Sequence, residues 1–439
     1  VPLPIFINKK TKQPLKDQKV IDRIASIYEK KGSDCWFSDD PKVFLGEDYD
    51  PKEYEKLNDI VEVWFDSGST HSFVLEKRKD LKWPADMYLE GSDQHRGWFH
   101  SSLLESCGTR GKAPFKSILS HGFVVDGKGL KMSKSLGNVV SPEDILKNYG
   151  ADILRVWVAA SDYAEDLRID NGILAQHAEA YRKIRNSFRF ILGNLKDSYE
   201  KQKLEKLEIK KFEELEQYIL HKLFIIDKSV KENLKNYNFH KLYKELLNFC
   251  TLDLSSFYFD IRKDVLYCDS ENSKKRKECV IVLNIILECL LKWFAPILVF
   301  TTEEIYSLVG KSTDSIHESD FTEIPKKWEN NNLDNKWSKL LKIKQEVNIS
   351  IEEKRSNKEI GSSLEAELKI ITDEKNFEIM EKLDLAEYFI TSKAEKIKSN
   401  KKEEFKIEVK KAIGTKCSRC WKILETKCAR CEAITSKNN

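Results

Sequence analysis

The sequence predicts a multidomain chain that is α/β in its first third and α-helical through its middle, followed by a small α+β segment and a zinc-binding tail. Three observations support this fold class. A strand, turn, helix and strand succeed one another early in the chain, helical periodicity covers the middle, and four closely spaced cysteines lie at the end. A chain of 439 residues is long enough for roughly two to four domains with cores of their own.

The N-terminal third contains the predicted α/β unit. Its first 60 residues are mixed and turn-rich, and the run VEVWFDSGSTHS that follows is β-rich and ends in a turn. The remaining elements are expected in this order: a strand at 86–90, a turn at 91–93, a helix at 94–106 and a second strand within 117–125.

Strands joined through a helix in this way form a parallel sheet, and ligands bind at the carboxyl ends of such strands. The sequence therefore predicts a binding crevice at this edge, shared with the lysine loop described next. The other residues expected in the crevice are Glu90, Gly91, Asp93, Gln94 and His121.

The stretch GLKMSKSLGNVVSPEDIL, residues 129–146, predicts a flexible loop that runs into a helix. Glycines before the lysines and Gly137-Asn138 after them loosen the backbone, while Ser-Pro-Glu-Asp is typical of a helix start. Lys131 and Lys134 place two ammonium groups on this loop, which suits a multiply charged phosphate ligand that is gripped and then released. A solvated turn in a lysine-rich protein is the alternative, and the order of a Walker motif is absent.

The middle of the chain, from about residue 150 to 310, is expected to be helical throughout. Arginines line one face of one helix and apolar residues line the other, namely Arg182, Arg185 and Arg189 against Ile184, Phe188 and Ile191. The arginine face is expected either to bind a polyanion or to be merely solvated. Because the net charge is only +3, any contact with nucleic acid has to come from such local basic faces.

The apolar run VIVLNIILECLLKWFAPILVF resembles a membrane span. Asn284, Glu288 and Lys292 recur every fourth residue along it, which predicts one solvated face of an amphipathic helix that ends near Pro296. We therefore expect a helix of a soluble bundle and no membrane partner. From about residue 335 to 410 the sequence predicts a helix followed by alternating β-like runs.

The ten cysteines form two sets. Six are scattered and expected to be buried or inert: Cys35, Cys107, Cys250, Cys268, Cys279 and Cys289. The other four form two C-x-x-C pairs separated by seven residues: Cys417, Cys420, Cys428 and Cys431.

Four thiolates at this spacing favour a tetrahedral structural Zn²⁺ site, whereas a pair of disulfides, the alternative, would suit a secreted protein. The tail is too short to form a core, so the metal is expected to fold it. Lysines and arginines outnumber acidic residues in this tail, so it is expected to touch a polyanion. Its basic residues are Lys411, Lys416, Arg419, Lys422, Lys427, Arg430 and Lys437.

These motifs together resemble a known family. KMSKS, at residues 131–135, is similar to the signature loop of class I aminoacyl-tRNA synthetases. WFDSGSTHS, LEGSDQHRGWF and the terminal KCSRCW…CARC resemble the isoleucyl-tRNA synthetases among them, and the resemblance runs from end to end of the chain. It implies four parts: the C-terminal half of a Rossmann-type catalytic domain at 1–147, a helical anticodon-binding domain at 148–325, a junction domain at 326–410 and a zinc module at 411–439.

The resemblance also implies roles for the residues. The reaction would be ATP-dependent activation of isoleucine and its transfer to tRNA(Ile), with Mg²⁺ accompanying ATP. Lys134 would be the prime phosphate contact, with Lys131 supporting it. The crevice residues would hydrogen-bond the adenylate, with His121 and Gly122 near the adenine. Trp64 and Trp98 would wall the side-chain pocket, for which ordinary core packing is the alternative.

Two parts of the family pattern are absent from this sequence. No His-x-Gly-His turn occurs among the eight histidines, and the editing domain is missing. The chain starts Val-Pro-Leu-Pro without Met or a signal peptide, so we expect an interior start in a longer cytoplasmic protein, monomeric when complete. The chain would then need the N-terminal half of the same enzyme as a partner. A non-catalytic tRNA-binding module that has kept the motifs is the alternative.

Overall fold

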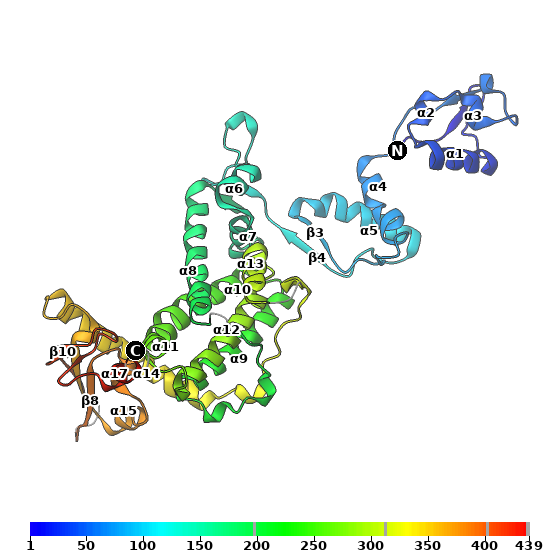
Figure 1. Ribbon diagram of the computed structural model, residues 1–439. Coiled ribbons are helices and arrows are strands. Elements are labelled where there is room, and N and C mark those ends of the chain that lie inside the picture. The colour runs from blue at the N-terminus through cyan, green and yellow to red at the C-terminus, as the bar shows by residue number, and fades with distance from the viewer. Residues whose placement is uncertain (196–198, 311–313, 401–403, 436–439) are drawn as a thin grey trace. The chain divides into compact units, whose positions relative to one another are not determined.

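The computed structural model describes residues 1–195, 199–310, 314–400 and 404–435, and it divides the chain into two compact units (Figure 1). The first unit comprises residues 1–124 and 163–167, and the second comprises residues 125–162 and 168–439. Each unit is described by itself. This division into two units does not test the four predicted domain boundaries, which stay predictions.

The first unit begins with a small mixed layer of strands and helices, as the turn-rich sequence predicts. Strand β1 (Phe6–Asn8) pairs antiparallel with β2 (Tyr54–Lys56), and helices α1 (Gln18–Lys31), α2 (Cys35–Ser38) and α3 (Pro41–Leu45) lie between them in sequence. The core of this layer consists of Phe6, Val20, Ile24, Cys35, Trp36, Phe44 and Leu45.

The second part of this unit is the predicted strand–helix–strand. Strand β3 (Tyr88–Gly91) runs parallel to β4 (Ile118–His121), with α5 (Trp98–Arg110) between them in sequence, so the parallel pairing is confirmed. The predicted helix at 94–106 is partly wrong. Residues Ser92–Arg96 form a 3-10 turn, and Gly97, with φ −132° and ψ −114°, separates this turn from α5.

The prediction of β structure for VEVWFDSGSTHS is wrong. This segment forms α4 (Val63–Gly68) and a short π-helical turn (His71–Leu75). The carboxylate of Glu62 accepts a hydrogen bond from the backbone N–H of Trp64 at 2.6 Å and caps the helix, which overrides the β propensity of the valines and aromatics.

The second unit is mainly a helical bundle (Figure 1). Its helices are α6 (Pro142–Tyr149), α7 (Ala151–Ala160), α8 (Asn171–Leu195), α9 (Glu214–Lys235), α10 (Phe239–Asn248), the π-helix η7 (Phe249–Phe259), α11 (Asp260–Cys268), α12 (Lys274–Phe294) and α13 (Val299–Val309). One strand, β6 (Leu167–Ile169), interrupts the helical pattern and pairs with β5 (Val124–Asp126). The helical prediction is wrong for residues 199–213 as well, which are irregular apart from two 3-10 turns, Leu204–Lys206 and Ile209–Lys211. It is confirmed for the helices given above, and Ile184, Phe188 and Ile191 are buried as expected.

Helix α12 corrects one expectation. Its apolar run is a bundle helix as predicted, but Asn284 and Glu288 are 3% and 7% exposed rather than solvated. The amide oxygen of Asn284 accepts from the backbone N–H of Glu200 at 2.9 Å, and Glu288 pairs with Lys292 at 3.0 Å. Polar residues every fourth position therefore mark a buried hydrogen-bonded stripe, because neighbouring segments cover this side as well.

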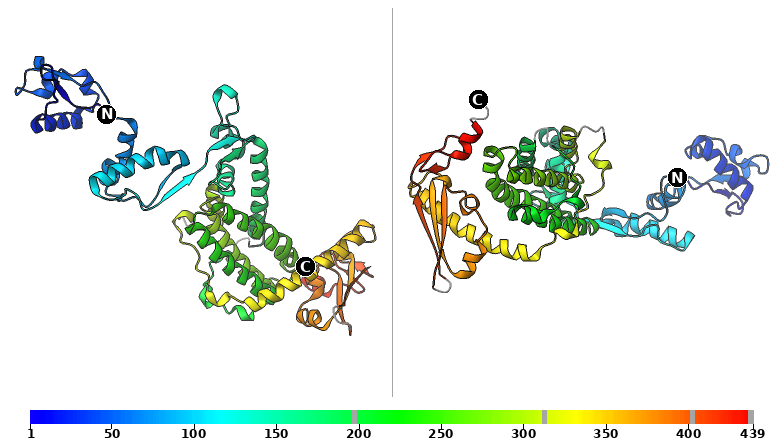
Figure 2. Two further views of the ribbon diagram at one scale, coloured as in Figure 1. Left: turned by 180° about the vertical axis from the view of Figure 1, so that it is seen from behind. Right: turned by 60° about the horizontal axis from the view of Figure 1, so that its bottom comes forward.

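The C-terminal part of the second unit has the predicted helix and β-runs. Helix α14 (Asn331–Ser356) contacts both α9 and strand β9 (Figure 2). Strand β7 (Ala366–Thr372) lies at the centre of a three-stranded sheet, parallel to β8 (Lys393–Lys398) and antiparallel to β9 (Phe405–Lys411). The chain then forms β10 (Thr415–Lys416), β11 (Ile423–Leu424) and α17 (Ala429–Thr435).

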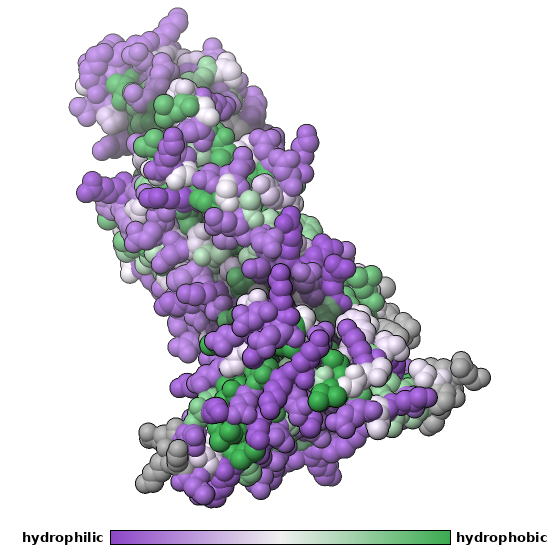
Figure 3. Space-filling view, turned by 90° about the vertical axis from the view of Figure 1, so that its left-hand side faces the viewer, coloured by the Kyte–Doolittle hydropathy of each residue, from purple (hydrophilic) through white to green (hydrophobic). Residues whose placement is uncertain are grey.

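The face of the molecule in Figure 3 is mainly hydrophilic, with hydrophobic residues in small groups. Over the residues that the structure describes, none of the helices combines the length and apolarity needed to cross a bilayer.

Candidate functional site

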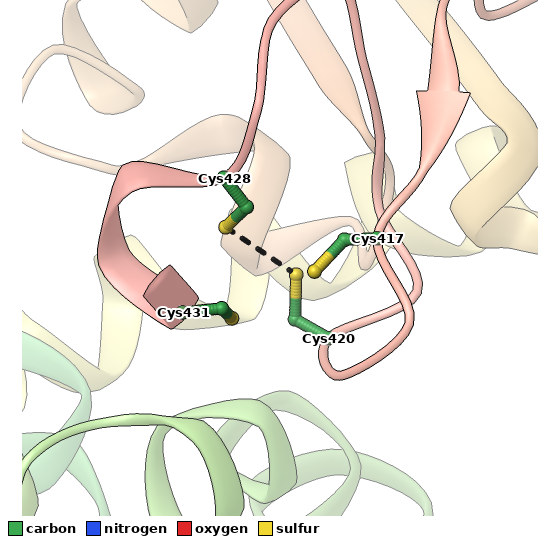
Figure 4. Close-up of side chains that lie close together, drawn as sticks. All are labelled: Cys417, Cys420, Cys428 and Cys431. Atoms are coloured by element: carbon green, nitrogen blue, oxygen red, sulfur yellow. Dashed lines mark hydrogen bonds between the residues drawn. The ribbon is translucent and has the colours of Figure 1, made fainter. Parts of the chain in front are cut away.

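The four cysteines predicted as a metal site lie together in the folded tail (Figure 4). Their sulfur atoms are all within 4.8 Å of one another, and Sγ of Cys420 and Sγ of Cys428 are 3.9 Å apart. Four thiolates about 2.3 Å from a tetrahedral Zn²⁺ would be about 3.8 Å from one another. The cluster could therefore hold a metal ion with little rearrangement, and no disulfide joins these cysteines.

Two different local structures present the two cysteine pairs. Cys417 and Cys420 lie in a tight turn between β10 and β11, in which the backbone N–H of Cys417 donates to the carbonyl of Lys422 at 2.9 Å. The backbone N–H of Trp421 donates to the carbonyl of Cys417 at 3.0 Å, and Trp421 has a φ of +65°. Cys428 directly precedes α17, whose first turn carries Cys431.

The environments of the thiols differ. Hydrogen bonds from the backbone N–H of Cys420, and also from that of Arg419, lower the pKa of Cys417 to about 7. Burial raises the pKa of Cys431 to about 12. One thiolate is thus favoured by its own turn, whereas a buried thiolate requires a bound cation to offset desolvation.

The tail is attached to the bundle through its own arginines. The guanidinium of Arg430 pairs with Asp264 of α11 at 2.6 Å, and Arg419 donates to the backbone carbonyl of Cys268 at 2.8 Å. These two cations are therefore engaged within the chain, and the expected contact of the tail with a polyanion stays a prediction. Of the other predicted cations, Lys411, Lys416 and Lys427 are exposed and Lys422 is half-buried, while Lys437 lies outside the described residues.

In the first unit, the ends of the parallel strands bring several of the predicted residues together. Gly91 pairs in register with His121, and a Cβ at Gly91 would lie 2.7 Å from Oδ1 of Asp93 and 3.8 Å from the His121 ring. Gln94 Nε2 donates to Asp93 at 3.2 Å. Glu90 is exposed beside them on β3, so this strand edge presents the polar groups that the sequence predicts.

Both predicted tryptophans lie around Gly97. A Cβ at Gly97 would be 3.3 Å from the ring of Trp64 and 2.6 Å from Oε1 of Gln94. Trp98 is held by two hydrogen bonds, from its backbone N–H to Gln94 Oε1 and from its indole N–H to the carbonyl of Ser67, both at 2.9 Å. Its ring stacks on Tyr88 at 4.3 Å, while Trp64 is 42% exposed. Trp98 is thus largely a packing residue, and Trp64 offers an open aromatic face.

Gly122 is required by a close backbone approach. A Cβ there would overlap the carbonyl of Glu165, and the N–H of Gly122 donates to the carbonyl of Tyr163 at 2.9 Å. His121 Nδ1 lies 2.8 Å from the carbonyl of Gly122. The imidazole is therefore oriented by the backbone carbonyl of the next residue.

The lysine loop belongs to the second unit. Lys131 and Lys134 are exposed, and within the described part of the chain neither ammonium group has an ion-pair or hydrogen-bond partner. The predicted helix start is confirmed, because Oγ of Ser141 accepts from the backbone N–H of Glu143 at 3.2 Å at the start of α6. The crevice expected to join this loop to the strand ends stays a prediction.

Sequence reasoning missed the two residues that organise this loop, Asp126 and Asn138. Asn138 was expected to loosen the backbone, but its side chain instead hydrogen-bonds to Asp126, Lys131 and Ser133. The signal available was the pair of turn dipeptides at the two ends of the loop, Asp126-Gly127 and Gly137-Asn138.

The arginines of α8 occupy its exposed face as predicted. Arg182 pairs with Glu179 at 3.0 Å, Arg185 donates to the hydroxyl of Tyr181 at 3.4 Å, and Arg189 is exposed. Their binding role stays a prediction.

Two segments of the chain match known protein families. Residues 1–170 match the tRNA synthetases class I (I, L, M and V), and residues 216–371 match the anticodon-binding domain of tRNA ligase. The chain is 64% identical to the isoleucine–tRNA ligase of Pelagibacter ubique (strain HTCC1062) over 96% of this chain and 47% of that protein. It is 44% identical to the isoleucine–tRNA ligase of Gluconobacter oxydans (strain 621H) over 97% of this chain and 44% of that protein.

The chain therefore spans about half the length of the curated relatives it matches. Among solved structures, it is similar to the LeuRS–tRNA–LeuAMS ternary complex of Agrobacterium radiobacter K84, with a TM-score of 0.56 and 14% identity. That match covers 84% of this chain and 42% of the other chain and shows a common fold.

Proposed function

We propose that this chain, which belongs to the class I tRNA synthetases, supplies part of an isoleucine–tRNA ligase. The observation that carries the proposal is the 64% identity, over 96% of the chain, to a relative of that name. The reaction would have two steps. The isoleucine carboxylate attacks the α-phosphate of ATP to give isoleucyl-adenylate and pyrophosphate, and the terminal hydroxyl of tRNA(Ile) then takes the isoleucyl group.

The proposed role of the lysine loop is to stabilise the phosphates. Negative charge builds on the departing pyrophosphate, and ammonium groups beside it lower the barrier if they contact the transition state more strongly than bound ATP. Lys134 is the proposed principal contact and Lys131 the supporting one. Their exposure and lack of partners within the described residues support this role, because a cation already neutralised by a carboxylate would contribute less.

The proposed role of the strand ends in the first unit is to bind the adenylate. Glu90, Gly91, Asp93 and Gln94 would hydrogen-bond its polar groups, with His121 and Gly122 near the adenine. The exposed ring of Trp64 would wall the isoleucine side chain, and the stacked ring of Trp98 would support it. The carboxylate of Asp93 and the imidazole of His121 on one strand edge support this assignment.

Binding of tRNA(Ile) is assigned to the second unit. Residues 216–371 carry the anticodon-binding family match, and the exposed arginines of α8 offer phosphate contacts. We assign a structural Zn²⁺ to the four cysteines, because four sulfurs at tetrahedral spacing suit this soft cation. Mg²⁺ would accompany ATP. We place the enzyme in the cytoplasm as a monomer.

A second candidate is a non-catalytic tRNA-binding module. The observation that favours it is the anticodon-binding match over residues 216–371. The proposed enzyme requires the remainder of an isoleucine–tRNA ligase, because a crevice with only one wall leaves the reactants solvated and unaligned.

The test is isoleucine-dependent exchange of pyrophosphate into ATP. It compares the purified chain, the N-terminal segment of the Pelagibacter ubique relative, and a mixture of the two. We expect exchange only in the mixture. Exchange by the chain alone would contradict the requirement for a second segment, and a mixture that binds tRNA without exchange would favour the non-catalytic module.

A further inference from the structure

One carboxylate closes the base of the lysine loop. Oδ1 of Asp126 accepts hydrogen bonds from the backbone N–H groups of Lys128 at 3.0 Å and Leu130 at 2.8 Å. Two backbone hydrogen bonds tighten the same turn, from Asp126 to the carbonyl of Leu130 and from Gly129 to the carbonyl of Asp126, both at 2.9 Å. Four hydrogen bonds therefore close the turn that leads into the lysine loop.

The second carboxylate oxygen joins this turn to the far end of the loop. Oδ2 of Asp126 accepts from Nδ2 of Asn138 at 2.9 Å, twelve residues later. The same Nδ2 donates to the carbonyl of Lys131 at 3.3 Å, and Oδ1 of Asn138 accepts from the backbone N–H of Ser133 at 2.9 Å. The half-buried side-chain amide of Asn138 is thus hydrogen-bonded to Asp126 at the end of β5 and to the residues before and after Met132.

The turn packs closely against the start of helix α8. A Cβ at Gly127 would overlap the carboxylate of Asp170, and Oδ1 of Asp170 accepts from the backbone N–H of Ile173 at 2.7 Å at the start of α8. The hydrogen bond from Asn138, followed by that from the N–H of Leu130, lowers the pKa of Asp126. We call the hydrogen bonds of the Asn138 side chain to Asp126, Lys131 and Ser133 the clasp. The clasp is made with the ionised carboxylate of Asp126, which is a stronger acceptor than a neutral carboxyl group.

We propose that Asn138 is a positioning residue that fixes the backbone of Lys131 and Lys134, so that their ammonium groups are preorganised for phosphate. The inference rests on the proposed function for the identity of the ligand. Each lysine side chain already has four rotatable bonds, and electrostatic stabilisation of a transition state depends on cations that need no reorganisation. The clasp removes the backbone part of that freedom and leaves the side chains unpaired.

A first experiment tests the clasp in the chain itself. Native proteolysis with trypsin, read by mass spectrometry, reports cleavage after Lys131 and after Lys134. Asn138→Ala should accelerate both cuts about tenfold, because loss of side-chain hydrogen bonds raises the open population of the loop. Asn148→Ala is the matched control, since Asn148 is an exposed asparagine of the adjacent helix α6. Unchanged cleavage in Asn138→Ala would overturn the clasp, and this result does not depend on any enzymatic activity.

A second experiment tests the positioning role in the chain combined with its N-terminal segment. Asn138→Ala should lower the kcat of isoleucine-dependent exchange by about 10- to 100-fold and leave the KM for isoleucine unchanged, because the isoleucine pocket is elsewhere. A variant that merely unfolds would lose binding and turnover together. No exchange by the unmodified combination would overturn the proposed function and leave the proteolysis result standing.

An exchange of the two residues distinguishes the hydrogen bond from the bulk of the side chain. Asn138→Asp places two carboxylates against each other and should loosen the loop as much as Asn138→Ala. Adding Asp126→Asn restores an amide donor opposite a carboxylate, so the double variant should recover slower cleavage and faster exchange than Asn138→Asp. A double variant no better than Asn138→Asp would overturn the Asp126–Asn138 bond as the cause.

Discussion

Arg430 and Asp264 form a bidentate ion pair that joins the cysteine-rich tail to helix α11. Nη1 of Arg430 lies 2.6 Å from Oδ2 of Asp264, and Nη2 lies 2.9 Å from Oδ1. Burial raises the pKa of Asp264, but the hydrogen bonds and charge of Arg430 outweigh burial and hold the pKa below its usual value. Among the described residues from 414 to 435, the fully buried ones are Cys420 and Cys431, so the tail depends on such external contacts.

The first prediction follows from this ion pair. Arg430→Ala should destabilise the attachment of the tail by about 2 kcal/mol, because it leaves the carboxylate of Asp264 without its charged partner. Hydrogen exchange over residues 415–435 measures the effect. Lys427→Ala is the control, since its ion pair with Glu432 at 3.7 Å is exposed and worth at most about 1 kcal/mol. Equal protection in the two variants would show that Arg430 is not an anchor.

The second prediction concerns the metal. The purified chain should contain about one equivalent of zinc, and Cys428→Ser should lose most of it, because the closed site needs four thiolates. Cys107→Ser, which removes an exposed cysteine outside the cluster, should keep the metal. Metal analysis with circular dichroism before and after chelation measures both. A metal-free tail that stays folded would refute the structural role of zinc.

The third prediction is a pH dependence carried by Lys344. Burial lowers the pKa of this ammonium to about 8, although its Nζ donates to the carbonyl of Tyr388 at 2.5 Å. An unfolded lysine has a pKa of about 10.4, so between these values the unfolded chain binds more protons and the free energy of unfolding rises with pH.

Over that pH range the rise in the free energy of unfolding due to Lys344 should approach about 3 kcal/mol in the wild-type chain, and it should be absent from Lys344→Met. Denaturant titrations at pH 7.5 and pH 10 give the difference between the two proteins, in which the other titrating groups cancel. Parallel pH profiles would mean that Lys344 stays charged in the folded state.

The fourth prediction concerns tRNA. Replacing Arg182, Arg185 and Arg189 together by Ala should weaken binding of tRNA(Ile) and lower the slope of log K against log salt by up to about 3. Arg355→Ala is the control, because that exposed arginine lies on α14 and pairs with Glu352. Filter binding at several salt concentrations measures the slope, and an unchanged slope would mean that the α8 face is only solvated.

Features set by local spacing or by the order of the elements could be predicted from the sequence. The helix start at Ser141 and the cysteine cluster depend on residues close in the chain, the parallel β3–β4 pair follows from the strand–helix–strand order, and all three are present. Features set by one specific hydrogen-bond partner could not. Asn284 is buried because the backbone N–H of Glu200 meets it, eighty-four residues away. Asn138 restrains the loop because it reaches Asp126, and no turn propensity specifies that partner.

The site residues divide in the same way. Trp64 and Trp98 were predicted as one wall, but the structure separates an exposed ring from one that is stacked on Tyr88 and hydrogen-bonded to Ser67. The motif around Trp98 does not identify the hydrogen-bond acceptor of its indole N–H, because that acceptor, the carbonyl of Ser67, is brought there by the packing of α4 against α5.

The measurement that tests the account most directly is the effect of Lys134→Ala on isoleucine-dependent pyrophosphate exchange by the chain combined with its N-terminal segment. Lys147→Ala, an exposed lysine of α6, is the matched control. If Lys134 contacts phosphate charge that develops during the reaction, exchange should fall by about 100-fold or more, while the control retains full activity and isoleucine binding is unchanged in both. Equal exchange by the two variants would contradict the account, because the lysine loop would then be only a solvated turn.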